Sequence, residues 1–234
     1  MSGEAKRGFT VFMELFRIIS AFVLAAVTAY LLGSMNFAMI STKAFLHKDI
    51  RDFGSGNAGM TNVLRTLGKG PAALTLIGDF SKGAVAVLLG HVIFTYVGGR
   101  PELLLGGYVS ALFALLGHLF PLYYGFKGGK GIATCAGVLA VLDWRVLLII
   151  LGVFLIVTAV SRYVSLGSVC AAVAYPVSTL ILRLCEHSSA VWGDTIMAFL
   201  IAVIVIVMHR KNIERLFNGT ENKIGQKKKQ QPDT

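Results

Sequence analysis

Residues 11–40 read V-F-M-E-L-F-R-I-I-S-A-F-V-L-A-A-V-T-A-Y-L-L-G-S-M-N-F-A-M-I, an apolar run interrupted by only two charged side chains, Glu14 and Arg17. About 20 predominantly apolar residues are enough for a helix to cross the hydrocarbon core of a bilayer. The run therefore predicts a membrane helix with turns to spare. Gly33, Ser34 and Asn36 near its end are small or polar residues, which suit close contacts between membrane helices.

Apolar runs of this kind recur along the whole chain, so the sequence predicts a polytopic membrane protein rather than a cleaved export signal or a single anchor. The expected fold class is all-α, a bundle of about seven transmembrane helices. Some runs are short enough to be tilted, re-entrant or fused, which would lower the count to as few as five. The predicted spans are Val11–Ile40, Pro71–Val97, Leu103–Leu122, Ile132–Leu142, Val146–Val160, Val164–Leu184 and Val191–Met208.

The composition agrees with this fold class. The 234 residues are 55% hydrophobic and 15% charged, and a soluble domain of that composition would leave large apolar patches facing water. We expect a single membrane domain over residues 1–225, followed by a basic, disordered tail over residues 226–234. The three cysteines lie in or beside apolar runs with no zinc-like spacing, so no metal, cofactor or disulfide framework is predicted.

The net charge of +10 would suggest a nucleic-acid partner in a soluble chain, but no basic face interleaved with aromatic residues is present, so none is expected. In a membrane protein, excess lysine and arginine marks the cytoplasmic side. With seven spans and the N-terminus outside, the inward segments carry most of the 22 lysine and arginine residues; Arg100 is one of the few placed outside. The C-terminus and every polar loop considered below then lie in the cytoplasm.

A polar segment, G-S-G-N-A-G-M-T-N-V-L-R at residues 54–65 (the first glycine-rich segment), follows the first span. Glycines allow tight turns and close approach to a ligand, and the polar side chains and Arg65 offer hydrogen bonds and positive charge, so the segment indicates a phosphate site. A dinucleotide site is disfavoured because no buried strand precedes the glycines. An ordinary solvated loop remains an alternative.

A second polar segment, Y-Y-G-F-K-G-G-K-G-I-A-T at residues 123–134 (the second glycine-rich segment), follows G-H-L-F-P. It fails as a nucleotide-binding P-loop, because Gly131 follows Lys130 where Ser or Thr is required. Lys127, Lys130 and the backbone amides of Gly128, Gly129 and Gly131, at the start of a predicted helix, still suit a second anion. Lysines that only mark the membrane edge are the alternative.

Two charged residues, Asp79 and Lys82, fall inside the second predicted span, three residues apart and hence on one side of the helix. They predict an ion pair, a polar site inside the bundle, or both. Two further polar stretches, S-R-Y-V-S-L-G-S at residues 161–168 and the segment after Met208, complete a set of basic, amide and hydroxyl groups beside lipid. Such a set suits joining a soluble phosphate ester to a fatty chain.

These motifs, G-S-G-N-A-G-M-T-N-V-L-R, G-H-L-F-P with F-K-G-G-K-G-I-A-T, R-Y-V-S-L-G-S, and H-R-K-N-I-E-R-L-x-x-G-T-E-x-K, resemble those of the PlsY family of bacterial membrane glycerol-3-phosphate acyltransferases. The resemblance covers residues from about Gly33 to Gly225, in order. It implies a multi-pass enzyme of the inner (plasma) membrane, with its active site at the cytoplasmic face. The enzyme would transfer an acyl group from acyl phosphate to the 1-hydroxyl of sn-glycerol 3-phosphate, giving lysophosphatidic acid and phosphate.

The resemblance also implies roles for residues of this chain, with membrane lipid and an upstream acyl-phosphate-producing enzyme as further partners. The expected catalytic residues are Arg65, Lys130, Ser165 and His209. The expected substrate-binding residues are Gly54, Ser55, Gly56, Asn57, Gly59, Thr61, Asn62, Lys127, Gly128, Gly129, Gly131, Ser168, Asn212 and Glu221. Ala58 and Met60 depart from the residues most common in the family, but neither position carries a polar function.

Two other functions remain open from the sequence. His47 and Asp52 have the spacing of the H-x-x-x-x-D motif of acyl-CoA-using glycerolipid acyltransferases, but the later motifs of those enzymes are missing. A transporter of organic phosphates would also need paired basic sites and charges inside the membrane. It would spread its polar residues along several helices, whereas here they are concentrated in loops predicted on one side.

Overall fold

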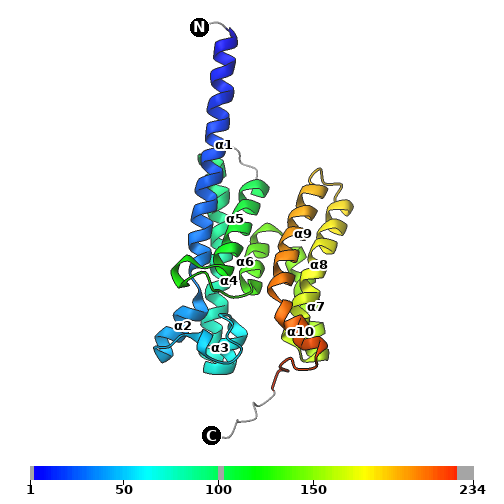
Figure 1. The fold of residues 1–234 in the computed structure, drawn as a ribbon. Helices are drawn as coiled ribbons and strands as arrows, with labels where there is room; N and C mark the ends of the chain where they lie inside the picture. Colours follow the sequence, from blue (N-terminus) through cyan, green and yellow to red (C-terminus); the bar gives the residue numbers. More distant parts are fainter. Residues whose placement is uncertain (1–2, 100–102, 226–234) are drawn as a thin grey trace. The chain divides into compact units, whose positions relative to one another are not determined.

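The computed structural model describes residues 3–99 and 103–225, and within these ranges every regular element is a helix (Figure 1). This confirms the all-α prediction. Arg100 and the predicted tail at 226–234 lie outside the described residues. The chain packs as two compact units, Met1–Trp144 and Arg145–Thr234.

Six helical segments of the described chain are long and apolar enough to cross a membrane: Lys6–Leu46, Lys69–Tyr96, Leu105–Tyr124, Trp144–Ser161, Val164–Cys185 and Val191–Met208. A further apolar helix, α6 (Ile132–Leu142), has 11 residues. At 1.5 Å per residue it is about half as long as the hydrocarbon core is thick. The structure therefore contains the predicted multi-span bundle, with one of the expected short members.

In the first unit, α1 (Gly3–Ser34), α4 (Lys69–Tyr96), α5 (Leu103–Leu119) and α6 pack together through glycines. A Cβ on Gly33 would lie 2.2 Å from the carbonyl oxygen of Ala114, and one on Gly117 would lie 2.3 Å from that of Tyr30, so α1 and α5 approach through reciprocal glycines. A Cβ on Gly137 of α6 would lie 1.8 Å from the Phe80 carbonyl oxygen of α4. Small residues allow this close backbone packing, which stabilises helix contacts in a bilayer because the hydrophobic effect does not drive helices together there.

The first predicted span, Val11–Ile40, is interrupted in the structure. Helix α1 ends at Ser34, and Asn36 begins a new helix, α2 (Phe37–Leu46), by accepting a hydrogen bond from the Met39 amide (3.1 Å) on its side chain. Asparagine is a preferred N-cap because its side-chain oxygen satisfies an amide that has no partner in the helix. The hydrophobicity of Phe37–Ile40 concealed this break.

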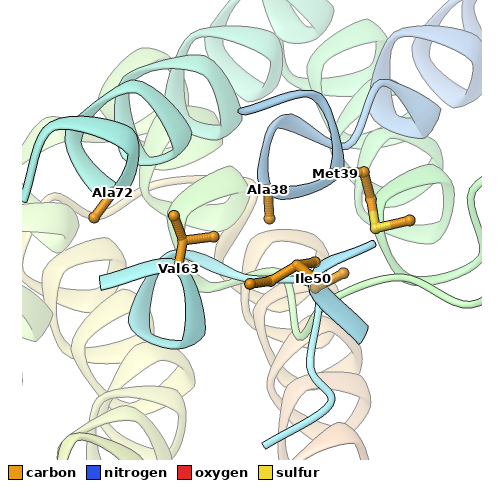
Figure 2. Close-up of a cluster of buried hydrophobic side chains, with 6 residues drawn as sticks. Ala38, Met39, Ile50, Val63 and Ala72 are labelled. Carbon is orange, nitrogen blue, oxygen red and sulfur yellow. The ribbon is translucent and has the colours of Figure 1, made fainter. Parts of the chain in front are cut away.

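The polar region predicted between the first two spans contains two helical elements, η1 (Ile50–Asp52) and α3 (Met60–Leu67). In unit 1 these lie with α2 beside the start of α4 (Figure 1). Figure 2 shows the labelled side chains of Ala38, Ile50 and Val63 converging from α2, η1 and α3. All three are fully buried, and their packing holds the first glycine-rich segment on the membrane helices.

The second unit contains α7 (Trp144–Ser161), α8 (Val164–Cys185), α9 (Val191–Met208) and α10 (Arg210–Phe217). Helices α8 and α9 pack side by side, and α10 follows α9 almost without a break. Gly167 of α8 fits against α7, where an added Cβ would lie 2.1 Å from Thr158 Oγ1. The α8–α9 connection is tied by a buried ion pair between Arg183 Nε and Asp194 Oδ2 at 2.5 Å.

Candidate active site

The first glycine-rich segment is shaped by the buried side chain of Asn62. Its Oδ1 accepts from the Ser55 amide (2.9 Å), and its Nδ2 donates to the carbonyls of Phe53 (2.9 Å) and Ile50 (3.2 Å). Gly54 has φ +61°, and a Cβ there would lie 2.1 Å from Asn62 Oδ1. A glycine is therefore required at position 54 on both conformational and steric grounds, and Asn62 fixes the loop from within.

Other polar groups of this segment remain at its surface. Ser55 and Arg65 are exposed, and Asn57 and Thr61 are partly buried. Gly59 begins α3, which places Thr61 in the first turn and Arg65 one turn later. The exposed face thus combines a hydroxyl, an amide and a guanidinium, as a phosphate site requires.

The second glycine-rich segment uses its glycines mainly for close packing. The Gly128 and Gly129 amides donate to the carbonyls of Leu119 (3.0 Å) and His118 (3.2 Å), so these two amides are occupied within the protein. A Cβ on Gly128 would lie 1.9 Å from the His118 carbonyl oxygen. The expectation that both amides face a ligand is therefore wrong, because folding the loop back onto the end of α5 uses them.

Positive charge remains at the second segment. Gly131 has φ +83° and is the N-cap of α6, whose first-turn amides have no acceptor within the helix. Lys127 is exposed and Lys130 partly buried directly before this helix start. The helix N-terminus and the two ammonium groups make a region suited to an anion.

Arg51 of η1, three residues before the first glycine-rich segment, links that part of the chain to the second segment. Its guanidinium binds Asp49 at 2.6 Å, and its Nη1 donates to the carbonyls of Tyr124 (2.8 Å) and Lys127 (3.2 Å). Burial alone would raise the pKa of Asp49, but hydrogen bonds and charge from Arg51 outweigh it and hold that pKa below its ordinary value. The pair is therefore ionised at neutral pH, and the two segments lie side by side.

A buried polar network lies beneath this junction. Lys82 Nζ is 2.8 Å from Asp79 Oδ1, 2.8 Å from the Met35 carbonyl oxygen and 3.0 Å from His118 Nδ1. All three side chains are at least 96% buried. The predicted ion pair of Asp79 and Lys82 is thus confirmed, and His118, from the G-H-L-F-P motif, completes it.

In the second unit, Glu221 gathers three polar side chains. Its carboxylate accepts from Ser165 Oγ (3.0 Å), Asn212 Nδ2 (2.9 Å) and Arg215 Nε (2.7 Å). Burial would raise the pKa of Glu221, but hydrogen bonds from Arg215, Asn212 and Ser165 outweigh it and lower the pKa. The ionised carboxylate fixes Ser165 of α8 and Asn212 of α10 in one cluster.

The remaining predicted residues of this unit are His209, the N-cap of α10, and Ser168, three residues after Ser165 in α8. His209, which is 2% exposed, has Nδ1 2.8 Å from the Val205 carbonyl oxygen, and Nδ1 must carry the proton because a carbonyl only accepts. Ser168 donates to the Val164 carbonyl of its own helix (2.9 Å). Arg162 and Ile224 exchange two hydrogen bonds (2.8 and 2.9 Å), which tie the closing segment to the α7–α8 turn.

The structure therefore assembles the predicted residues in two groups, the two glycine-rich segments in unit 1 and the Ser165–Asn212–Glu221 cluster in unit 2. Sequence reasoning missed the linking role of Arg51, because the partners that make the link are backbone carbonyls more than 70 residues away. It also left His118 without a partner. The nearby intramembrane Asp79 and Lys82 were the signal that a third polar group should join them.

Three comparisons bear on what this arrangement does. A family model described as glycerol-3-phosphate acyltransferase matches residues 23–219. The glycerol-3-phosphate acyltransferase of Clostridioides difficile (strain 630) is 43% identical over 216 residues, covering 92% of this chain and 100% of that protein. That of Dechloromonas aromatica (strain RCB) is 44% identical over 206 residues, covering 88% and 98%.

Solved structures give the same answer. The crystal structure of PlsY (YgiH), an integral membrane glycerol 3-phosphate acyltransferase, in its glycerol 3-phosphate form has a TM-score of 0.74 and 36% identity, covering 87% of this chain and 96% of that one. Its lysophosphatidic acid form has a TM-score of 0.71 and 35% identity, covering 87% and 95%. The protein is thus a multi-pass membrane acyltransferase, and it belongs to the glycerol-3-phosphate acyltransferase family to which PlsY also belongs.

Proposed function

We propose that this enzyme transfers an acyl group from acyl phosphate to the 1-hydroxyl of sn-glycerol 3-phosphate, releasing lysophosphatidic acid and inorganic phosphate. The observation that carries the proposal is the Arg51 contact that places two cationic, glycine-rich segments side by side. A donor and an acceptor that each carry a phosphate need two adjacent anion sites. The bound forms of PlsY, with glycerol 3-phosphate and with lysophosphatidic acid, support the acceptor and the product.

The proposal assigns binding and chemistry to side chains of both units. In unit 1, Arg65 and Lys130 neutralise phosphate charge, with Ser55, Asn57, Thr61 and Lys127 as hydrogen-bonding or charged neighbours. In unit 2, we assign Ser165 and His209 to catalysis, and Asn212 and Ser168 to substrate binding. The other predicted residues set the conformation of the segments or orient neighbouring side chains, and they do not supply positive charge: Gly54, Gly56, Gly59, Asn62, Gly128, Gly129, Gly131 and Glu221.

The chemistry follows from the donor. An acyl phosphate is a mixed anhydride whose phosphate is a good leaving group, so positioning and charge neutralisation supply most of the catalysis. The glycerol 3-phosphate hydroxyl oxygen bonds to the acyl carbon, the bond from that carbon to the phosphate oxygen breaks, and a substrate phosphate oxygen takes the hydroxyl proton. No acyl-enzyme intermediate is needed.

We also propose that residues 1–225 act as one domain of the cytoplasmic (plasma) membrane. The N-terminus lies outside, and the C-terminus and active site lie on the cytoplasmic side. The distribution of lysine and arginine between loops supports this orientation. An upstream enzyme that makes acyl phosphate supplies the donor.

Product analysis with purified protein tests the reaction. Acyl phosphate with glycerol 3-phosphate should give lysophosphatidic acid and phosphate, and acyl-CoA should give none. Arg65→Ala and Lys130→Ala should each lower kcat/KM by at least about 10²-fold, because each removes charge stabilisation from a transferring or bound phosphate. Lysophosphatidic acid formed from acyl-CoA but not from acyl phosphate would overturn the choice of donor.

The two other functions are less well supported. His47 ends α2 and is exposed, as is Asp52, and in the described chain no side-chain hydrogen bond or ion pair joins them, so they do not form the dyad of the acyl-CoA enzymes. Phosphate-ester flux into vesicles without acylated product would instead indicate a transporter.

His209→Ala tests which group takes the hydroxyl proton. Lost turnover with intact substrate binding would favour His209 over a substrate phosphate as the general base.

A further inference from the structure

We propose that Asp79, Lys82 and His118 are positioning residues: together they hold the two glycine-rich segments at the separation that the acyl-transfer reaction requires. This inference rests on the proposed function and concerns how its two anion sites are kept in register. It is carried by the contacts of Lys82 and by the place of the His118 ring between the two segments.

Lys82 is fully engaged within the protein. A lysine ammonium has three N–H donors and no acceptor, and Nζ has three partners at 2.8 to 3.0 Å: Asp79 Oδ1, the Met35 carbonyl oxygen and His118 Nδ1. Asp79 in turn accepts from the Phe37 amide at 3.4 Å. The pair therefore fixes the break between α1 and α2, from which the first glycine-rich segment continues.

The contact with Lys82 also determines the state of His118. His118 Nδ1 lies 3.0 Å from the Lys82 ammonium, which can only donate, and 3.5 Å from Asp79 Oδ1. The shorter contact makes Nδ1 an acceptor, so the proton of the neutral ring lies on Nε2. The ring is 3% exposed, so both its orientation and its tautomer are set by the network. No described residue forms a hydrogen bond with Nε2, which points to the junction of the two segments.

The ring meets both segments at Gly129. A Cβ on Gly129 would lie 2.4 Å from His118 Nε2 and 2.5 Å from the Ala58 carbonyl oxygen, so not even a methyl group fits where the ring, the first segment and the second meet. The Gly129 amide donates to the His118 carbonyl (3.2 Å), and Asn36 Nδ2 donates to the Ala58 carbonyl (3.3 Å). A shift of the ring would therefore move one segment relative to the other.

A double substitution separates positioning from folding. Replacing both partners of a buried ion pair by apolar residues is often neutral for stability, whereas removing one leaves a buried charge. Asp79→Leu with Lys82→Met leaves no lone buried charge and should fold, with reduced stability because the Met35 carbonyl, the Phe37 amide and His118 Nδ1 lose a partner. It should bind glycerol 3-phosphate with a Kd within about threefold of wild type and lose about 10²-fold in kcat, since misplacement by about 1 Å costs that much. Arg183→Met with Asp194→Leu removes a comparable buried pair in unit 2 and should leave kcat within about threefold.

Two substitutions of His118 give the second readout. His118→Asn keeps an acceptor near Nδ1 for Lys82 but leaves the Gly129 side empty, whereas His118→Gln reaches the Nε2 position. Positioning predicts a higher kcat for His118→Gln than for His118→Asn. The reverse order, or a folded Asp79→Leu/Lys82→Met protein with kcat within threefold of wild type, would overturn the inference.

A distance measurement keeps this test independent of the proposed reaction. Spin labels at Asp52→Cys and Phe126→Cys, both exposed, on a background without the three native cysteines, report the separation of the two segments. The distance distribution should broaden in the Asp79→Leu/Lys82→Met protein and stay narrow in the Arg183→Met/Asp194→Leu protein. Wild-type protein that binds glycerol 3-phosphate without acylating it would refute the function alone, whereas unchanged distances would refute the positioning role.

Discussion

At the scale of single residues, several polar side chains of the sequence motifs support the loops rather than bind a ligand. The amide of Asn62 forms hydrogen bonds with three backbone groups. The carboxylate of Glu221 accepts hydrogen bonds from Ser165, Asn212 and Arg215. Both residues are at least 93% buried. A sequence motif of an active site therefore contains both residues that bind the ligand and residues that hold the loop in shape. The spacing of the residues in the sequence does not distinguish the two kinds.

Glu221→Gln should destabilise the second unit in a pH-dependent way. Although burial raises the pKa of Glu221, its hydrogen bonds lower it below the ordinary value of 4.5. Its stabilising contribution is therefore complete above that ordinary value and is lost as pH falls through the lower folded-state pKa. Replacing the carboxylate by the glutamine amide should lower the free energy of unfolding by about 1 to 3 kcal/mol at pH 7.

Thermal unfolding of the two proteins in detergent, from pH 7 to pH 3, measures this effect. The difference between wild type and Glu221→Gln should shrink as pH falls below 4.5. A difference that is constant over this range would show that the carboxylate charge contributes nothing, and that the substitution acts through shape.

Arg51→Lys should weaken the link between the two glycine-rich segments although the charge is kept. A lysine presents a point charge, whereas the planar guanidinium binds Asp49 and reaches the carbonyls of Tyr124 and Lys127 at the same time. We expect kcat to fall by about tenfold with a smaller change in KM. Steady-state kinetics measures this, and Lys48→Arg, an exposed neighbour, is the control; equal kinetics for wild type and Arg51→Lys would contradict the link.

At the scale of elements, the described helices of unit 1 are placed by glycines rather than by large apolar side chains. Gly33 with Gly117 sets α1 against α5, and Gly83 with Gly137 sets α4 against α6. The short helix α6 carries the second glycine-rich segment at its start, so its depth against α4 decides where Lys130 lies. The position of the anion site therefore depends on how α6 packs against α4.

Gly137→Ala tests this packing. The added Cβ would lie 1.8 Å from the Phe80 carbonyl oxygen, so α6 must move away from α4, at a cost of about 1 to 3 kcal/mol. Gly152→Ala is the matched control, because nothing lies within 4 Å of that Cβ and alanine favours a helix over glycine. Thermal unfolding should separate the two, and equal midpoints would exclude tight α4–α6 packing.

At the scale of the whole molecule, the sequence predicted the membrane helices closely. The runs Ile132–Leu142 and Val191–Met208 coincide with α6 and α9, because continuous hydrophobicity is a direct consequence of crossing lipid. The break at Asn36 and helix α3 were not predicted, since a single cap residue and a short amphipathic helix give little periodic signal. Contacts such as that of Arg51 with Lys127 depend on tertiary packing and leave no local pattern.

The proposed orientation predicts opposite labelling of the two ends of α9. Ser189→Cys, an exposed position before α9, should react with a membrane-impermeant thiol reagent in intact cells. Phe217→Cys, exposed at the end of α10, should react only after the membrane is permeabilised. Both are made without the native cysteines, and the opposite pattern would invert the topology and remove the cytoplasmic active site.

The reciprocal glycines of α1 and α5 have a consequence for changes in chain length. Inserting one residue turns everything beyond it by 100° around the helix axis. Between Tyr30 and Gly33, such an insertion would rotate one member of the pair away while the other stayed in place. At Phe9 to Phe16, the large apolar side chains are exposed. The same insertion there would only lengthen the exposed part of α1. Natural additions and engineered fusions should therefore be tolerated at the start of α1 and rejected near its end.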